Sequence, residues 1–249
     1  MRQVLGTQGQ YPLILRGSQA QGRVRAWPDS PTIAQLVLYT QSTPPSSDDL
    51  RQWCDQLRSR GYVAIRTGAL PRHLHSLVTA NGFVPLQHLV LLECPTLHRR
   101  PFQGLHGLAL RPPTQRLHRR HLEQVAGVDL AAFGAPWHLD ESTIDDIRTA
   151  TPYNRARIVR RGGAIVGYAV SGRDTRTGYL QRLAVHPDAQ RTGIGAALVA
   201  DSLAWIRRHD ASRTLVNTHV GNEAALDLYR RARFVEMDED LCVFERSLQ

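Results

Sequence analysis

Residues 179–198 read YLQRLAVHPDAQRTGIGAAL and decide the fold. Their first seven residues are typical of a β-strand, a turn follows at Pro187, and a loop with Gly193 and Gly195 leads into a helix that continues to about His209. The first N–H groups of such a helix lack partners within it and can bind an anion. A Cβ at either glycine would fill the space of a phosphate oxygen or strain the backbone. The segment therefore predicts a phosphate-binding site between strand and helix, to which Arg191 adds a positive charge.

Two common phosphate sites do not fit this loop. A P-loop requires a lysine, and the chain contains none. A dinucleotide site requires a third glycine, where Leu198 stands, and an acidic residue about 20 positions further on. Residues 213–217 contain no acidic residue, so a dinucleotide site is not expected.

The remaining match is Gln190-x-x-Gly193-x-Gly195 after the strand, and it resembles the acyl-CoA signature of the GNAT N-acetyltransferase superfamily. A second motif, residues 222–229 followed by Phe234, is similar to that family's Asn-x-x-Ala-x-x-Leu-Tyr helix. The resemblance covers residues 105–248. It implies the α/β GNAT acyl-CoA N-acyltransferase fold, with a mixed sheet that is antiparallel at its start.

The resemblance also implies acetyl-CoA as the cofactor. The strand would pair with the pantetheine arm through its backbone, and the loop would hold the pyrophosphate. Asn222 would bind the cofactor arm, although it is equally a good helix cap. The residues expected to bind the cofactor are Leu183, Ala184, Val185, Gln190, Arg191, Thr192, Gly193, Ile194, Gly195, Ala196 and Asn222.

Tyr229 occupies the family's general-acid position and is the expected catalytic residue, able to protonate the departing thiolate. The alternative is a core tyrosine. A backbone N–H near Val185 would hold the oxyanion. The general base is not visible, because family members often carry a glutamate on this strand and residues 178–185 contain no carboxylate, with Tyr179 near that place.

Four acids remain as candidates for a base, each also a normal residue for a helix start or loop: Asp129, Asp140, Glu141 and Asp174. His186 precedes Pro187, and a role in the turn is favoured over one as a base. The acceptor is expected between the first two helices and a late hairpin. Phe133, Trp137 and His138 either line this pocket or pack the helix junction, and the acids in 237–240 either suit a cationic amine or form a solvated turn.

The chain resembles itself at a shift of 151 residues, which aligns residues 63–93 with 214–244. We therefore expect two tandem GNAT-like domains: a degenerate one over residues 1–97, a linker at 98–104, and the catalytic one over 105–249. In the first half, a central strand is expected at 34–39 and a helix at 50–60. The phosphate loop between them, residues 41–49, has no glycine, two prolines and two acids that repel pyrophosphate, so we expect one cofactor per chain.

The second half is predicted to begin with a strand at 108–111, helices at 114–125 and 140–149, and a strand at 156–160. Gly162 and Gly163 then mark the turn of an antiparallel hairpin. In this scheme Arg233 stands where the family usually places glycine, and it is expected to disturb the end of the preceding helix.

Composition limits the classes of function. The 249 residues carry a formal net charge of +9 from 31 basic residues, all arginine and scattered along the chain, so we do not expect a nucleic-acid partner. No run of about 18 apolar residues predicts a membrane span, and residues 1–21 lack the apolar stretch of a secretory signal, which favours a cytoplasmic protein. Cys54, Cys94 and Cys242 are far apart, so we expect buried thiols and neither a disulfide nor a metal site.

Together these features predict an N-acetyltransferase that transfers acetyl from acetyl-CoA directly to a primary amine of a small molecule or amino acid, acting as a monomer or homodimer. Two alternatives stay open. One is a protein or peptide N-acetyltransferase, and the other is a non-catalytic acyl-CoA-binding regulatory protein, suggested by the missing glutamate and by Arg233.

Overall fold

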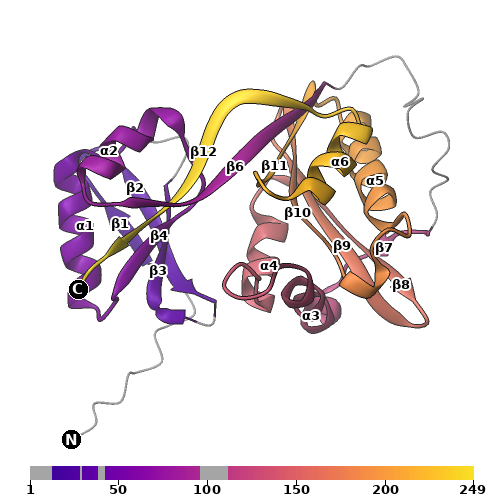
Figure 1. Ribbon diagram of the computed structural model, residues 1–249, viewed down its shortest axis with the longest axis horizontal. Helices are drawn as coiled ribbons and strands as arrows, with labels where there is room; N and C mark the ends of the chain where they lie inside the picture. Colours follow the sequence, from indigo (N-terminus) through magenta and orange to yellow (C-terminus); the bar gives the residue numbers. More distant parts are fainter. Residues whose placement is uncertain (1–12, 29, 39–42, 96–111) are drawn as a thin grey trace, which may run out of the picture. The chain divides into compact units, whose positions relative to one another are not determined.

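The chain folds into two compact units in the computed structural model, which describes residues 13–28, 30–38, 43–95 and 112–249 (Figure 1). The first unit is Met1–Leu89 with Glu239–Gln249, and the second is Val90–Asp238. The expected linker, residues 98–104, and the expected strand at 108–111 lie outside the described residues.

The first unit is a mixed sheet with two helices. Its strands lie in the order β1 (Leu13–Arg16), β2 (Gln21–Trp27), β3 (Ser30–Leu38), β4 (Ala64–Thr67) and the end of β12 (Val235–Ser247), with β5 (Leu70–Pro71) also against β12. Neighbours are antiparallel except β3 and β4, which run parallel because α1 (Ser47–Ser59) crosses over between them. The 3-10 turn η1 (Arg72–Leu74) and helix α2 (His75–Ala80) follow.

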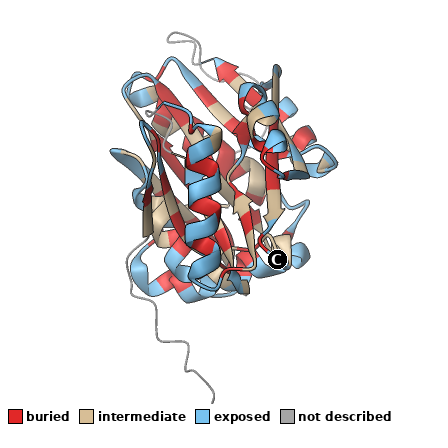
Figure 2. Ribbon diagram, turned by 90° about the vertical axis from the view of Figure 1, so that its left-hand side faces the viewer, coloured by how far each residue is buried: buried red, intermediate tan, exposed pale blue. Residues whose placement is uncertain are grey.

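Burial in the first unit follows its amphipathic elements. Leu50, Trp53 and Leu57 lie one turn apart on α1 and are buried against the strands, while its other face is exposed (Figure 2). The helix begins earlier than the predicted residue 50, because Ser46 and Asp49 form a capping box at its start. The predicted central strand is β3, of which residue 39 lies outside the described residues.

The second unit repeats this plan and adds to it. Its sheet has the order β6 (Val84–Pro95), β11 (Arg213–His219), β10 (Thr177–Val185), β9 (Ala164–Arg173), β8 (Tyr153–Arg161) and β7 (Gln115–Arg116). Its helices are α3 (Leu122–Phe133), α4 (Glu141–Thr149), α5 (Ile194–Arg208) and α6 (Glu223–Arg231), with short 3-10 turns η3 (Arg119–His121) and η4 (Pro187–Ala189). One core lies between the sheet and α3 and α4, and another between the sheet and α5 and α6.

Most of the predicted elements of this unit are confirmed, including the hairpin between β8 and β9 at Gly162 and Gly163. The helix predicted at 114–125 is wrong. Gln115–Arg116 pairs with β8 instead, and the helix runs from Leu122 to Phe133. Its buried residues Val125, Val128 and Asp129 continue the buried face past residue 125, where the helix was predicted to end.

The repeat is visible where α2 and α6 end. In both places, a phenylalanine N–H donates to the carbonyl five residues earlier, at 3.1 Å for Phe83 and 3.0 Å for Phe234. The residue before it has a left-handed backbone, with φ of +76° at Gly82 and +68° at Arg233. Arg233 therefore adopts the conformation that glycine favours, and the expected disturbance of this helix end is not found.

The last strand of each repeat lies in the other compact unit. Leu92 and Cys94 of β6 follow α2 in sequence but are buried in a core of the second unit. Cys242 and Phe244 of β12 follow α6 but are buried in the core of the first. The compact units thus differ from the expected division into residues 1–97 and 105–249, because each core is completed by a strand from the other half of the chain.

Candidate functional site

The strand β10 diverges from its neighbour β11. The two are parallel and pair at only three positions, where Thr177, Gly178 and Tyr179 lie opposite residues 213–215. On its other side β10 pairs with β9 along almost its whole length, from Gly178 to Val185. In the described part of the chain, the second half of β10 therefore has a strand partner on one side only.

The free side of β10 can be assigned to particular backbone groups. The N–H of His186 donates to Val166 on β9 at 2.9 Å, so the Val185 carbonyl points away from β9, and the Gln190 side chain donates to it at 3.2 Å. In a strand a residue's own N–H and C=O point the same way. The groups of Val185 and Leu183 thus face the diverging side. The backbone groups of Ala184 face β9, opposite Tyr168. In this part of the strand, Leu183 and Val185 therefore have backbone groups that can bind a ligand, and Ala184 does not.

A short turn connects β10 to α5. His186 accepts a hydrogen bond from the N–H of Asp188 at 3.3 Å, which is the turn role that we favoured for it. The Thr192 hydroxyl donates to the Ala189 carbonyl at 2.6 Å. Arg191 and Gly193 both have left-handed backbones, with φ of +57° and +85°. This conformation explains the glycine at 193 and leaves the Arg191 side chain exposed.

The N-terminus of α5 has no side-chain cap, since its N-cap is Gly193. Its first N–H groups, from Ile194, Gly195 and Ala196, therefore have no partner within the helix. The corresponding helix of the first unit, α1, is closed instead. Asp49 accepts hydrogen bonds from the backbone N–H of Ser46 at 2.9 Å and of Ser18 at 2.8 Å, and its carboxylate stands where an anion would bind.

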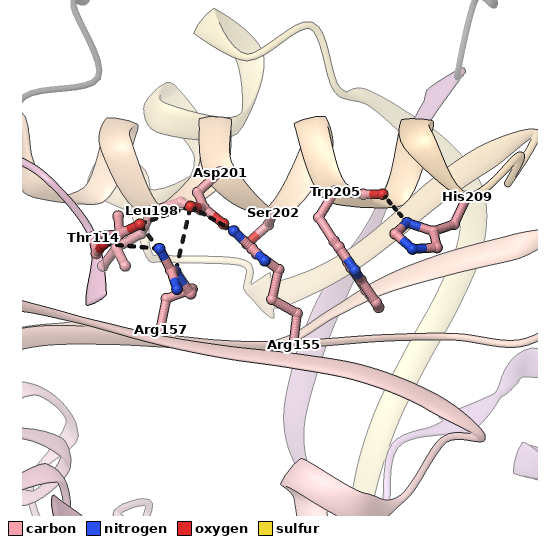
Figure 3. Close-up of polar contacts among 8 residues, drawn as sticks. All are labelled: Thr114, Arg155, Arg157, Leu198, Asp201, Ser202, Trp205 and His209. Carbon is pink, nitrogen blue, oxygen red and sulfur yellow. Dashed lines mark hydrogen bonds and ion pairs between the residues drawn. The ribbon is translucent and has the colours of Figure 1, made fainter. Parts of the chain in front are cut away.

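Two contacts fix α5 in place. A Cβ on Gly195 would lie 3.1 Å from Leu228, so the glycine lets α5 approach α6 closely. On the opposite side, Asp201 bonds to Arg155 at 2.6 Å and to the Thr114 hydroxyl at 2.6 Å (Figure 3). Burial alone would raise the pKa of Asp201, but these hydrogen bonds lower it overall, so the carboxylate stays charged.

The helix α6 carries the two residues of the second motif. The Asn222 side-chain oxygen caps the helix by accepting from the N–H of Ala225 at 3.2 Å, which leaves its amide group for other partners. Tyr229 is 5% exposed and packs against Phe234. Its hydroxyl makes no hydrogen bond within the described residues. Burial raises the pKa of Tyr229 well above its usual range, an effect that the Arg182 guanidinium partly offsets.

A buried ion pair beneath β10 was missed from the sequence. Asp129 is fully buried on α3 and receives two hydrogen bonds from Arg182, at 2.8 and 2.7 Å. The Tyr168 hydroxyl and the N–H of Leu139 also donate to it. Four donors use the lone pairs of this carboxylate, so it is poorly placed to act as a base. In the sequence each of these two charged residues resembles an ordinary surface charge of its segment.

The other acids considered as bases also have structural roles. Asp140 caps α4, accepting from the N–H of Thr143 at 2.7 Å, and Glu141 is exposed beside it. Asp174 closes the β9–β10 turn and accepts from the Tyr179 hydroxyl at 2.8 Å. Burial would raise the pKa of Asp174, but its backbone hydrogen bonds outweigh that and lower it. Asp140 and Asp174 therefore both make structural contacts, whereas Glu141 is an exposed residue of the first turn of α4.

Two of the three residues expected to line an acceptor pocket, Phe133 and Trp137, contact Arg182. Its guanidinium stacks 3.5 Å from the ring centre of Phe133 and donates to the Trp137 carbonyl at 2.9 Å. His138 is buried, with 6% of its surface exposed. These contacts favour packing of the helix junction. Of the acids in 237–240, Glu239 accepts from the N–H of Arg72 at 3.2 Å and Asp240 lies near His75, all within the first unit.

The cysteines are buried free thiols, as predicted. Burial raises the pKa of Cys94 to about 11, and it also raises the pKa of Cys54 and Cys242. Among the residues that the structure describes, no group of three or more His, Cys, Asp or Glu side chains is arranged to hold a metal ion. No helix in this part of the chain is long and apolar enough to cross a bilayer.

Comparison with known proteins identifies the architecture. Residues 122–234 match the model of the acetyltransferase (GNAT) family. A tandem GNAT protein from the clavulanic acid biosynthesis pathway, solved without acetyl-CoA, is similar with a TM-score of 0.63 and 11% identity, covering 94% of this chain and 81% of that one. No curated protein sequence matches the chain.

Two further solved structures extend the likeness. A GCN5-related N-acetyltransferase from Sphaerobacter thermophilus has a TM-score of 0.61 and 14% identity, covering 93% of this chain and 77% of that one. Another from Kribbella flavida has a TM-score of 0.57 and 12% identity, with coverages of 95% and 90%. At such identities the likeness concerns the fold, and it extends over nearly the whole chain.

Proposed function

Residues 122–234 match the acetyltransferase (GNAT) family, and from that premise we propose that the chain is an acetyl-CoA-dependent N-acetyltransferase acting on a primary amine of a small molecule or amino acid. The observation that carries the proposal is the diverging edge of β10, which leads directly into the uncapped N-terminus of α5. An extended arm that ends in a pyrophosphate needs these two features in this order.

The residues present fit such a ligand. Leu183 and Val185 offer backbone groups along the free edge, and the first N–H groups of α5 offer an anion site, with Arg191 exposed beside it. The Tyr229 residue is 5% exposed, and its hydroxyl has no hydrogen-bond partner among the described residues. A thiol sulfur at the end of the arm would give it one.

Acetyl-CoA, when bound, supplies a thioester whose acetyl group an amine can take. We assign the Val185 N–H to the carbonyl oxygen, because this N–H points to the diverging side of the strand. Tyr229 holds its proton at the hydroxyl over the whole neutral range, since burial raises its pKa. We assign it the delivery of that proton to the departing sulfur.

Direct transfer, without an acyl-enzyme, is favoured by the state of the cysteines. A thiolate is the nucleophilic form, and burial holds all three thiols protonated near neutral pH. Cys242 lies in the first unit, in whose core it is buried. None of the three is therefore suited to carry an acetyl group.

The binding step is tested by calorimetric titration of the whole chain with acetyl-CoA. Arg191→Glu reverses a charge beside the phosphate site at a residue that is already exposed and non-glycine, and we expect it to weaken binding at least about tenfold. Arg208→Glu makes the same charge change at the other end of α5 and serves as the control. Gly195→Glu is less informative, because its Cβ would also press on Leu228.

We expect one site per chain, since Asp49 closes the corresponding helix of the first unit. Two sites would refute this account of the first unit. No binding at all would refute the proposed function, whereas binding without turnover on any amine would support the regulatory alternative. Once binding is shown, release of CoA thiol, followed with a broad amine panel, separates an enzyme from the regulatory alternative.

A further inference from the structure

Gln181 occupies an irregularity in β10, two residues before Leu183 of the proposed site. Leu180 lies opposite Ser171 and Arg182 lies opposite Val170, so Gln181 is an extra residue in the pairing with β9. Its side-chain oxygen is buried and has no hydrogen-bond partner in the described structure. A buried carbonyl oxygen without a donor is unusual, and a bulge commonly redirects a side chain for a purpose.

The space for this amide is made by a glycine on the neighbouring strand. A Cβ on Gly172 would lie 2.8 Å from the Gln181 side-chain oxygen and 2.1 Å from the Thr151 hydroxyl. That hydroxyl is not available to the amide, because it donates to the Tyr153 carbonyl at 2.9 Å. The amide oxygen is therefore held in place without a donor from the protein.

Two acids of the described structure near the ends of β10 and α3, Asp174 and Asp129, are held by hydrogen bonds. Arg182, the neighbour of Gln181, is paired with Asp129 through two hydrogen bonds, and Asp174 is held by the turn that follows β9. An amide oxygen accepts a hydrogen bond but does not remove a proton near neutral pH. Burial disfavours a charged ammonium group at such a place, whereas a neutral amine can donate its N–H.

We propose that the Gln181 side-chain oxygen accepts an N–H of the acceptor amine, and that the site selects amines with the larger neutral fraction at pH 7, such as the α-amino group of an amino-acid amide or peptide, over more basic alkylamines, which are almost wholly protonated there. The inference rests on the proposed function. The amine nitrogen forms the new C–N bond as the C–S bond breaks. Tyr229 gives its proton to the sulfur, and the proton lost by the nitrogen returns through water.

The expected selectivity follows from the free amines. With ordinary pKa values of about 7.7–8.0 for an α-amine and about 10.4 for a lysine amine, the neutral fractions at pH 7 differ about 300-fold. A more basic amine is also a better nucleophile, which reduces the advantage. We therefore expect transfer to the α-nitrogen to exceed transfer to the side-chain nitrogen at least about tenfold at pH 7, and the ratio to fall as the pH rises from 8 to 10.

The test uses the full chain, acetyl-CoA and twenty dipeptide amides of the form X-Lys, each offering both amines in one molecule. Tandem mass spectrometry locates the acetyl group. Gln181→Met removes the acceptor oxygen, Gln181→Glu replaces the amide with a base of the same shape, and Gln124→Met makes the first change at an exposed residue of α3. Acetyl-CoA titration and circular dichroism establish that each variant is folded and binds the cofactor.

We expect Gln181→Met to raise KM for the amine at least about tenfold with a smaller change in kcat, and Gln124→Met to change neither. Gln181→Glu should raise transfer to the lysine nitrogen at pH 7 and shift its pH profile downward, an effect that a merely structural role would not produce. Because Glu has the shape of Gln, this variant keeps the test valid if Gln181→Met does not fold.

Preferential transfer to the lysine nitrogen by the wild type would overturn the inference. So would an unchanged KM and an unchanged choice of nitrogen in both Gln181 variants. Transfer to neither nitrogen by a chain that binds acetyl-CoA also overturns it, because α-amines would then not be the acceptors. Failure to bind acetyl-CoA overturns the proposed function instead.

Discussion

The buried pair of Asp129 and Arg182 permits a double-mutant cycle with large expected effects. Asp129→Asn removes the charge opposite an arginine whose side chain is only 18% exposed, and Arg182→Met leaves a carboxylate with no exposed surface. Breaking a buried pair from one side costs about 3–5 kcal/mol, because the remaining charge has no partner. Each single variant should therefore lose about that much free energy of unfolding.

The double variant Asp129→Asn with Arg182→Met combines the same two substitutions and removes both charges. Asparagine keeps only one of the two oxygens, so either the Tyr168 hydroxyl or the Leu139 N–H loses its acceptor, at about 1–3 kcal/mol for the unpaired group. Its total cost should thus fall well below the sum of the two singles, by about 3 kcal/mol or more. This difference measures the coupling of the two side chains.

Urea unfolding followed by circular dichroism and tryptophan fluorescence measures all four corners of the cycle. Asp140→Asn is the matched control, since asparagine caps a helix as well as aspartate does, and its expected change is close to zero. Additive losses in the double variant would refute the argument, because they would mean that the two charges do not depend on each other. Losses below about 1 kcal/mol in the single variants would show that water reaches the pair.

Three more outcomes are expected. Tyr229→Phe should lower kcat about 100-fold and leave the acetyl-CoA affinity within about twofold, as measured by thiol release and calorimetry; equal loss in both would indicate a packing role. Arg233→Gly should raise the free energy of unfolding by about 0.5–1 kcal/mol because it relieves a left-handed backbone, whereas Gly82→Ala should lower it by a similar amount; opposite signs in urea titrations would contradict this. Asp49→Asn should cost about 1 kcal/mol at neutral pH through the weakened cap. The hydrogen bond from the Ser46 N–H is the main cause that lowers the pKa of Asp49 below 3.8, and burial opposes it. The charged carboxylate therefore stabilises the fold fully above pH 3.8, and this stabilisation is lost as the pH falls through the lowered pKa of Asp49. The difference from the wild type should vanish in strong acid, and a difference that persists there in acid unfolding curves would argue against the charge.

The features that were predicted from the sequence have local signals. Gly193, with its left-handed backbone, and the alternation in residues 179–185 lie within one short segment, so neighbouring residues were enough to predict strand, loop and helix. The cap at Asn222 and the apolar spacing after it predicted α6 in the same way. Local backbone chemistry determines such elements wherever the chain later places them.

The features that were missed depend on contacts between distant segments. Asp129 and Arg182 are 53 residues apart, and each looks like an ordinary surface charge in its own segment. The exchange of β6 and β12 was not predicted either, because the pattern of a strand shows which face is buried but not which strand it pairs with. The exact residues that line an acceptor site also depend on contacts between distant segments, so the sequence alone does not predict them.

The placement of β12 affects the order in which the chain can fold during synthesis. The first unit needs Cys242, Phe244 and Leu248 for its core, so this core stays incomplete until residues 239–249 have left the ribosome. Loss of Glu239–Gln249 would therefore destabilise the first unit, most of which is synthesised before the second. In limited proteolysis, a chain without residues 239–249 should be cleaved first in the first unit, near the N-terminus. The second unit should be protected longest.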